Sequence, residues 1–188
     1  MTMRMTGLFN RVRHTRFSSV RRITLIALGI VIGTFQLCGL AGLRINTTQS
    51  LPMGFYITGT EPQANLIEFC PAEPFASFAI ERGYRDQGNC RDGAAPLLKP
   101  LVAQVGDVVE LSERGIAVNG SLLHNTAPLK ADTKGRPLTA WTFGRYVVAP
   151  GTVWVASSYS PRSFDSRYLG PIPVSAIRDH VRPLLTAW

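Results

Sequence analysis

The residues in this chain that could do chemistry are a serine, a lysine and an acid–arginine pair, and the serine is Ser50. It ends a run of amides and hydroxyls, NTTQS, and Pro52 and Gly54 follow it closely. Proline fixes φ and glycine tolerates positive φ, so the serine is predicted to lie on a constrained turn. A serine held in this way is a candidate nucleophile. The alternative is an ordinary loop that connects two parts of the chain.

The candidate base is Lys99, which interrupts the apolar run Leu97–Val102. On an extended chain Leu97, Lys99 and Leu101 share one face, so an inward-facing run carries the ammonium into apolar surroundings. An unperturbed lysine, with a pKa of about 10.4, is almost wholly protonated at neutral pH, and burial must depress that pKa before the amine can serve as a base. The alternative is a charged lysine that protects an edge strand, which Pro100 also fits.

The third stretch is Ser163–Pro173. On an extended chain Ser163, Asp165 and Arg167 would project from one side. An acid and a guanidinium two residues apart can pair and hold a rigid corner, and a neighbouring hydroxyl can steer a nearby ammonium. The alternative is a solvated polar strand.

The charge of the chain is unevenly distributed. Of its 20 Lys and Arg residues, six lie in the first 22 positions with no acid among them, and the other 14 are nearly balanced by 12 Asp and Glu. The formal charge of +8 therefore reflects a basic tail beside an apolar run, as the positive-inside bias predicts for a cytoplasmic segment. A nucleic-acid partner is not predicted.

The apolar run is Ile23–Leu43, 21 residues without a charge. At about 1.5 Å per residue it can cross a hydrocarbon core of about 30 Å. A cleaved signal peptide is the alternative, but the run exceeds the usual signal core of about 7–15 residues. We expect a cytoplasmic tail over 1–22, a transmembrane helix over 23–43 and an exported domain over 44–188.

The three cysteines divide between these parts. Cys38 lies inside the apolar run, whereas Cys70 and Cys90 both lie in the expected exported domain. A disulfide between these two would close a loop of about 20 residues and stabilise the fold by about 3 kcal/mol in an oxidising compartment; two free thiols are the alternative.

No metal or cofactor is predicted, because no histidine accompanies the pair at ligand spacing. The histidines stand alone, so a Ser–His–Asp site has no local support.

The exported domain is predicted to be mostly β. One short helix is expected at 73–82, inside the presumed disulfide loop. Asn119-Gly120 is a strong signal for a two-residue hairpin, and a second hairpin is expected around Pro150-Gly151. An exposed loop is expected at 84–95 and a long irregular insertion at 125–143. Strands are predicted at 53–57, 65–69, 97–102, 108–111, 115–118, 121–124, 147–149, 152–155 and 174–178.

In chain order, Ser50, Lys99 and the stretch Ser163–Arg167 resemble the motifs of the type I signal peptidase family of serine–lysine membrane proteases. More specifically, the chain resembles conjugative-transfer signal peptidases of the TraF type, whose first motif reads S-x-P-x-G-x-Y. Residues 50–56, SLPMGFY, match it. The resemblance covers nearly all of Ile23–Pro173. It implies a twisted antiparallel β domain with an apolar flank near the bilayer, in which Ser50 is the nucleophile and Lys99 the general base.

The same resemblance implies supporting roles for four other residues. Thr48 would supply a hydroxyl to the oxyanion hole, beside the backbone amide of the serine. Ser163 would orient the lysine. Asp165 and Arg167 would hold the architecture of the site, and in TraF-type members the aspartate is also counted as important for activity.

The function that the resemblance implies is that of a serine endopeptidase in the inner membrane, with its N-terminus cytoplasmic and its catalytic domain periplasmic. In TraF-type members the substrate is a conjugative pilin precursor, and some members join its new C-terminus to its own N-terminus. The chain departs from the common family pattern at two places, since Pro100 follows the lysine where the family often has Arg, and Val105-Gly106-Asp107 replaces Pro-Gly-Asp. Ser157-Ser158-Tyr159 stand where bacterial housekeeping members usually have Gly-Asp-Asn, which argues against a general housekeeping signal peptidase. The alternatives are a signal peptidase for other exported precursors and a non-catalytic anchored protein of a conjugation or secretion apparatus.

Overall fold

The computed structural model describes residues 20–34, 42–59 and 65–187. The chain divides into two compact units, Met1–Leu43 and Arg44–Trp188, and each is described by itself.

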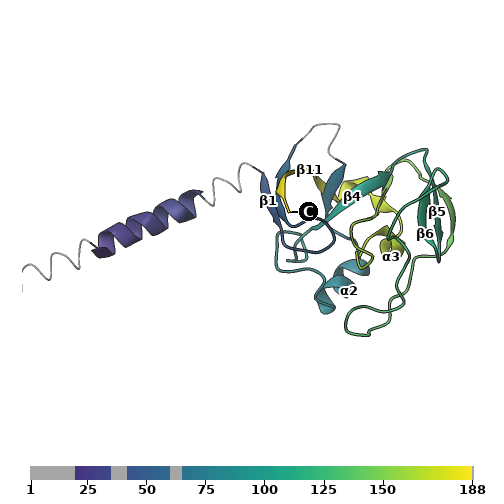
Figure 1. The fold of residues 1–188 in the computed structure, drawn as a ribbon, viewed down its shortest axis with the longest axis horizontal. Helices are drawn as coiled ribbons and strands as arrows, with labels where there is room; N and C mark the ends of the chain where they lie inside the picture. The colour runs from purple at the N-terminus through teal and green to yellow at the C-terminus, as the bar shows by residue number, and fades with distance from the viewer. Residues whose placement is uncertain (1–19, 35–41, 60–64, 188) are drawn as a thin grey trace, which may run out of the picture. The chain divides into compact units, whose positions relative to one another are not determined.

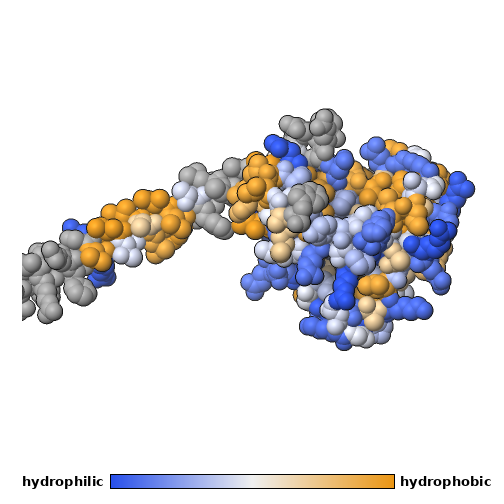
Figure 2. Space-filling view, in the orientation of Figure 1, coloured by the Kyte–Doolittle hydropathy of each residue, from blue (hydrophilic) through white to orange (hydrophobic). Residues whose placement is uncertain are grey.

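In the first unit residues 20–34 are helical. The apolar side chains of this helix, among them Ile23 and Ile26, are exposed (Figure 2). No helix in the described part of the chain is both long and apolar enough to cross a membrane. Residues 35–41 of the predicted span and residues 1–19 of the predicted tail lie outside the described residues.

From Leu43 onward the chain forms two β-sheets (Figure 1). In the larger sheet the strand order is β1-β2-β11-β3-β4-β9-β10, and neighbouring strands from β2 to β10 run antiparallel. In the smaller sheet the order is β7-β6-β5-β8. The strands of the larger sheet are β1 (Leu43–Asn46), β2 (Gly54–Thr58), β3 (Leu66–Phe69), β4 (Leu97–Ala103), β9 (Thr152–Val155), β10 (Ile172–Pro173) and β11 (Ile177–Thr186). Those of the smaller sheet are β5 (Val108–Ser112), β6 (Gly115–Val118), β7 (Ser121–Leu122) and β8 (Gly144–Val147).

Two short helices pack on the larger sheet, α2 (Phe75–Glu81) and α3 (Ser166–Leu169) (Figure 1). The core between them and the sheet is made of apolar side chains from β3, β4, β9 and both helices, namely Ile67, Phe69, Ala79, Leu97, Val153, Val155, Tyr168 and Leu169. A second buried cluster serves the smaller sheet, with Trp154 of β9 among its members. Strand β4 is an interior strand of the larger sheet, between β3 and β9, with a covered face on which a buried side chain can lie.

Most predicted elements are confirmed within a residue or two. The helix forms inside the 70–90 loop, and the structure contains a Cys70–Cys90 disulfide with an S–S distance of 2.02 Å. At the first hairpin Asn119 and Gly120 both have positive φ, 50° and 84°, and β6 pairs with β7 across them. The prediction of a mostly β, antiparallel domain is confirmed.

The second predicted hairpin is wrong. The chain does turn at 149–152, but β8 ends at Val147 and pairs with β5, whereas β9 pairs with β4 and β10. The backbone of Val148 bonds to Gly106 and Asp107, which lie in the turn just before β5 of the smaller sheet. The two strands belong to different sheets, and β9 contributes to both buried clusters, with Val153 and Val155 in the first and Trp154 beside Val148 in the second.

Two predictions near the C-terminus are also wrong. Residues 163–173 are not a continuous extended segment, because Asp165 caps the short helix α3 by accepting the Arg167 backbone N–H. The predicted closing strand at 174–178 is instead a 3₁₀ turn, η1 (Val174–Ala176), and then the longer β11. Strands β1 and β10 were not predicted.

Candidate active site

Ser50 lies on the turn between β1 and β2, and the structure explains the motif that surrounds it. A Cβ on Gly54 would lie 2.2 Å from the carbonyl oxygen of Leu185 in β11, and the φ of this glycine is 148°. Only glycine therefore fits where β11 passes. The buried Tyr56 donates its hydroxyl to the Pro52 carbonyl oxygen at 2.6 Å. The constrained turn that the sequence predicts is present.

Lys99 lies on the central strand β4, between β3 and β9, and only 4% of it is exposed. The alternative of an edge-protecting lysine is therefore wrong. The Lys99 Nζ donates a hydrogen bond to the Ser50 Oγ at 2.7 Å. Burial lowers the pKa of Lys99 to about 8, and among nearby charges Asp165 raises that pKa and Arg167 lowers it. An amine with such a pKa is partly neutral near physiological pH and can accept a proton from the hydroxyl that it contacts.

Thr48 adds a second hydroxyl beside the serine. Its Oγ1 lies 3.1 Å from the Ser50 Oγ and 2.7 Å from the Oδ1 of Asn46. The Thr48 hydroxyl therefore lies within reach of a group bound at the Ser50 Oγ.

Asp165 and Arg167 form a fully buried ion pair. The guanidinium meets both carboxylate oxygens, with Nε to Oδ1 at 2.8 Å and Nη2 to Oδ2 at 2.9 Å. The Arg167 Nη1 also donates to the carbonyl oxygens of Asn125 and Pro161. The predicted rigid corner is present, although it is built from a capped helical turn.

Ser157 connects this corner to the candidate nucleophile. Its backbone N–H donates to the Asp165 Oδ2 at 3.0 Å, and its carbonyl oxygen accepts from the Arg167 Nη2 at 3.0 Å. Its hydroxyl donates to the carbonyl oxygen of Ser50. A single buried residue thus joins the ion pair to the backbone of the Ser50 turn.

Ser163, which was expected to orient Lys99, lies in the same region but does not contact the lysine through a hydrogen bond. It is buried, and its Oγ has no hydrogen-bond partner among the described residues. The expected hydrogen bond between Ser163 and Lys99 is therefore not made in this structure.

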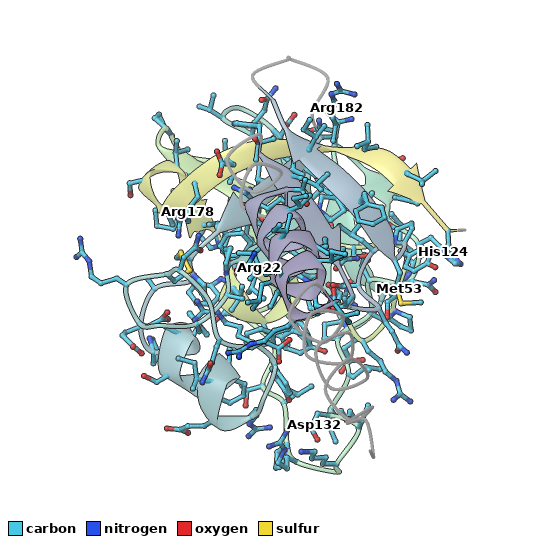
Figure 3. All side chains as sticks on the ribbon, turned by 90° about the vertical axis from the view of Figure 1, so that its left-hand side faces the viewer. Arg22, Met53, His124, Asp132, Arg178 and Arg182 are labelled. Atoms are coloured by element: carbon cyan, nitrogen blue, oxygen red, sulfur yellow. A yellow bond between two sulfur atoms is a disulfide. The ribbon has the colours of Figure 1, made fainter. Side chains whose placement is uncertain are left out.

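A cleft of about 930 Å³ opens over the serine and the lysine. Its far wall belongs to the 125–143 insertion, which contributes Leu129, Asp132 and Leu138. Asp132 accepts a hydrogen bond of 2.7 Å from the Tyr84 hydroxyl, which ties this wall to the rest of the domain, and another of 2.7 Å from the Arg136 Nε within the insertion itself. Figure 3 shows Asp132 on the opposite side of the domain from Arg182 of β11. The volume lies within the range of about 300–1,000 Å³ that is typical of ligand-binding clefts.

The motif-based reasoning did not identify two of the residues that hold the site. Asn46 belongs to the polar run before the serine. Its amide side chain can both donate to and accept from backbone groups, and this property was the signal in the sequence that could have indicated its role. Ser157 was noted only as a departure from a family pattern. Among the described residues no group of three His, Cys, Asp or Glu side chains could hold a metal ion.

Comparisons with known proteins place the whole domain in a family. Residues 19–185 match the family described as signal peptidase, peptidase S26. A plasmid transfer protein TraF of Escherichia coli is 40% identical over 149 residues, which cover 78% of this chain and 84% of that protein. A second Escherichia coli plasmid transfer protein TraF is 35% identical over 175 residues, covering 92% of this chain and 99% of that protein.

A solved structure of a signal peptidase I from Enterococcus faecalis covers 65% of this chain and 97% of that chain, with 17% identity and a TM-score of 0.35.

Proposed function

Because the chain belongs to the S26 signal peptidase family and, within it, to the TraF type, we propose that it is a serine endopeptidase that uses Ser50 as its nucleophile and Lys99 as its general base. The observation that carries the proposal is the 2.7 Å contact between the Lys99 Nζ and the Ser50 Oγ, made by a lysine that is almost wholly buried. An exposed ammonium at the same distance would remain charged and could not take the proton.

The first chemical step is the attack on the scissile carbonyl. Neutral Lys99 takes the hydroxyl proton of Ser50 while the Ser50 Oγ forms a bond to the carbonyl carbon. With a pKa of about 8, roughly a tenth of the enzyme carries a neutral lysine at pH 7. The rate should therefore rise with pH up to about that value.

The negative charge that develops on the carbonyl oxygen needs hydrogen-bond donors. The backbone N–H of Ser50 and the hydroxyl of Thr48, which lies 3.1 Å from the Ser50 Oγ, are the donors that we assign to it. Such donors contribute about 10²–10³ in rate when they are fixed in advance. The Lys99 ammonium then gives its proton to the leaving amine, and an ester on Ser50 remains.

We assign the substrate class from the relatives, whose names are those of plasmid transfer proteins. The substrate in this proposal is an exported precursor used in conjugation, most specifically a pilin precursor. The enzyme would be anchored in the inner membrane by residues 23–43 with the domain from residue 44 in the periplasm. Protease added from the periplasmic side should then digest the domain and spare the basic tail; digestion of the tail would refute this topology.

The ester on Ser50 has two outcomes. Water gives a linear product, whereas the precursor's own N-terminal amine gives a ring and returns the Ser50 hydroxyl. An amine outcompetes abundant water only when it is held in place, and effective molarities of about 10⁵ M or more show that positioning can suffice. We propose that a pilin held beside the enzyme cyclises in this way. The intact mass of the ring is one water below that of the linear product, and finding only the linear mass would leave a hydrolytic peptidase.

The dyad is tested with four variants of the full chain, co-expressed with a candidate pilin precursor. Ser50→Ala and Lys99→Met should each abolish processing while the protein stays folded and membrane-bound. Ser121→Ala and Lys134→Met, which change an exposed serine and an exposed lysine, should process normally. Normal processing by Ser50→Ala or Lys99→Met would overturn the proposal. A wild type that binds precursors without cleaving any would favour the non-catalytic assembly protein.

A further inference from the structure

Asn46 is the last residue of β1, and it is only 7% exposed. Its Nδ2 donates to the carbonyl oxygens of Thr48, Leu51 and Pro52 at 3.1, 3.2 and 3.0 Å. Its Oδ1 accepts from the Thr48 backbone N–H at 3.2 Å and from the Thr48 hydroxyl at 2.7 Å. One side chain therefore holds the residues on both sides of Ser50.

The hydrogen bonds around Ser50 also have a direction. Thr48 has one hydroxyl proton, and that proton goes to the Asn46 Oδ1. In the 3.1 Å contact between the Thr48 and Ser50 hydroxyls the donor is therefore Ser50. Lys99 donates to Ser50. The resting site is a one-way chain of donors from Lys99 through Ser50 and Thr48 to Asn46.

We propose that Asn46 is a positioning residue, which fixes the Ser50 turn and holds the Thr48 hydroxyl in a resting orientation from which it can turn to the substrate oxyanion. The proposal rests on the Ser50–Lys99 dyad proposed above. When the Thr48 hydroxyl turns away, the Asn46 Oδ1 keeps the Thr48 backbone N–H as a partner. Releasing the hydroxyl therefore leaves no buried oxygen without a hydrogen bond.

An amide is the side chain that this position requires. A carboxylate of the same shape would still accept from Thr48, but it could not donate to the Leu51 and Pro52 carbonyl oxygens. It would also place a negative charge at the end of the chain of hydrogen bonds that begins at Lys99. The charged groups that act on Lys99 are Asp165, which raises its pKa, and Arg167, which lowers it. An anion at position 46 would act in the same direction as Asp165.

The test compares two variants of the full chain in a precursor-cleavage assay across pH. For Asn46→Asp we expect kcat to fall by about 10²-fold, the order of loss that follows a small misplacement of a reacting group, with KM little changed and the pH midpoint moved upward. For Asn46→Ala we expect a similar fall in kcat without the upward shift. Asn119→Asp is the matched control, because that amide also accepts on one side, from the Val108 N–H of β5, and donates on the other, to the Asp107 carboxylate just before β5. It should keep the wild-type kcat and midpoint.

A second measurement tests the Thr48 hydroxyl itself, and its two single variants, Thr48→Ser and Thr48→Val, leave Asn46 in place and so do not depend on the folding of the Asn46 variants. Thr48→Ser keeps the hydroxyl and should keep most of the activity, whereas Thr48→Val should lose about as much as Asn46→Ala. The double variant Asn46→Ala/Thr48→Val should lose less than the product of the two single losses, because both act through one hydroxyl. Independent, multiplicative losses, or full activity in Thr48→Val, would overturn the proposal.

Ser50→Ala in the same assay separates the two hypotheses. If Ser50→Ala is inactive while Asn46→Asp has the wild-type kcat and pH midpoint, the inference about Asn46 fails and the dyad stands. If Ser50→Ala is active, the dyad itself fails. A loss of thermal stability in the Asn46 variants with no change in kcat would reduce Asn46 to a structural residue and would also overturn the inference.

Discussion

Replacing Lys99 with methionine should stabilise the folded protein at neutral pH while it removes the proposed base. Burial lowers the pKa of Lys99 from 10.5 to about 8. At about 1.36 kcal/mol per pKa unit, carrying the ammonium into the fold costs about 3 kcal/mol below pH 8. Methionine fills a similar space without that cost, but it loses the hydrogen bond to Ser50, worth about 1 kcal/mol. The expected net gain at pH 7 is about 2 kcal/mol.

The gain should depend on pH in a direction fixed by proton binding. Between pH 8 and 10.5 the unfolded chain holds the Lys99 proton and the folded chain does not, so the stability of the wild type rises with pH in this window. Above it the cost of the charge is gone, and the variant should be less stable than the wild type by about 1 kcal/mol, the lost hydrogen bond. The other titratable groups contribute equally to the pH dependence of both proteins, so their contributions cancel in the difference between the two free energies of unfolding.

Urea denaturation of the full chain in detergent at pH 7, 9 and 10.5 measures this difference. A gain of about 2 kcal/mol corresponds to about 4–8 °C in Tm for a chain of this size. Lys134→Met, at an exposed lysine, serves as the control and should show no pH-dependent difference. The reasoning is refuted if Lys99→Met differs from the wild type by the same free energy at every pH, or if the wild type is the more stable protein at pH 7.

Three further predictions follow from the same contacts. Asp165→Asn should lower the free energy of unfolding by about 3–5 kcal/mol, because it leaves the buried Arg167 without its anion. Asp179→Asn, in a partly exposed pair, should cost under about 1 kcal/mol, and equal losses of the two variants in denaturation would contradict this. Ser157→Ala should cost about 1 kcal/mol and lower kcat more than it raises KM, and unchanged cleavage kinetics would exclude its link to the nucleophile. Cys70→Ser should cost about 3 kcal/mol in non-reducing buffer and nothing in reducing buffer, and equal losses in both would exclude the disulfide as the cause.

The sequence was sufficient to predict the structure where a few neighbouring residues determine the backbone conformation. Pro52 and Gly54 predict the turn at Ser50, and Asn119-Gly120 predicts its hairpin, because proline fixes φ while glycine and asparagine tolerate the positive φ that tight turns require. The alternation around Lys99 indicated an inward-facing lysine, but an edge strand had the same pattern. Only the pairing of β4 with both β3 and β9 distinguishes the two.

What the sequence did not predict depends on contacts between distant segments. The turn at 149–152 has ordinary hairpin residues, yet its two arms enter different sheets, because β8 pairs with β5 whereas β9 pairs with β4 and β10. The 163–173 stretch has the alternation of a strand, but the buried pair of Asp165 and Arg167 bends it into a helical turn. Tertiary packing overrides local preference in both places.

The contacts of Ser157 could not be predicted for a similar reason. Its hydroxyl donates to the carbonyl oxygen of Ser50, which is 107 residues away in the sequence. No local sequence pattern indicates a partner at that distance. Asn46 is an intermediate case, since the residues that it bonds lie within six positions of it, but the pattern NTTQS is compatible with many loop conformations.

The most direct test of the Ser50–Lys99 dyad is to find the acyl group during turnover. A candidate pilin precursor is mixed with the full-length enzyme, the reaction is quenched in acid during the first turnover, and the enzyme is digested and analysed by mass spectrometry. The account predicts an added mass equal to the acyl part of the precursor on the peptide that carries Ser50, present with the wild type and absent with Lys99→Met. An acyl group on any other residue, or product that forms at every quench time without an adduct on Ser50, would contradict it.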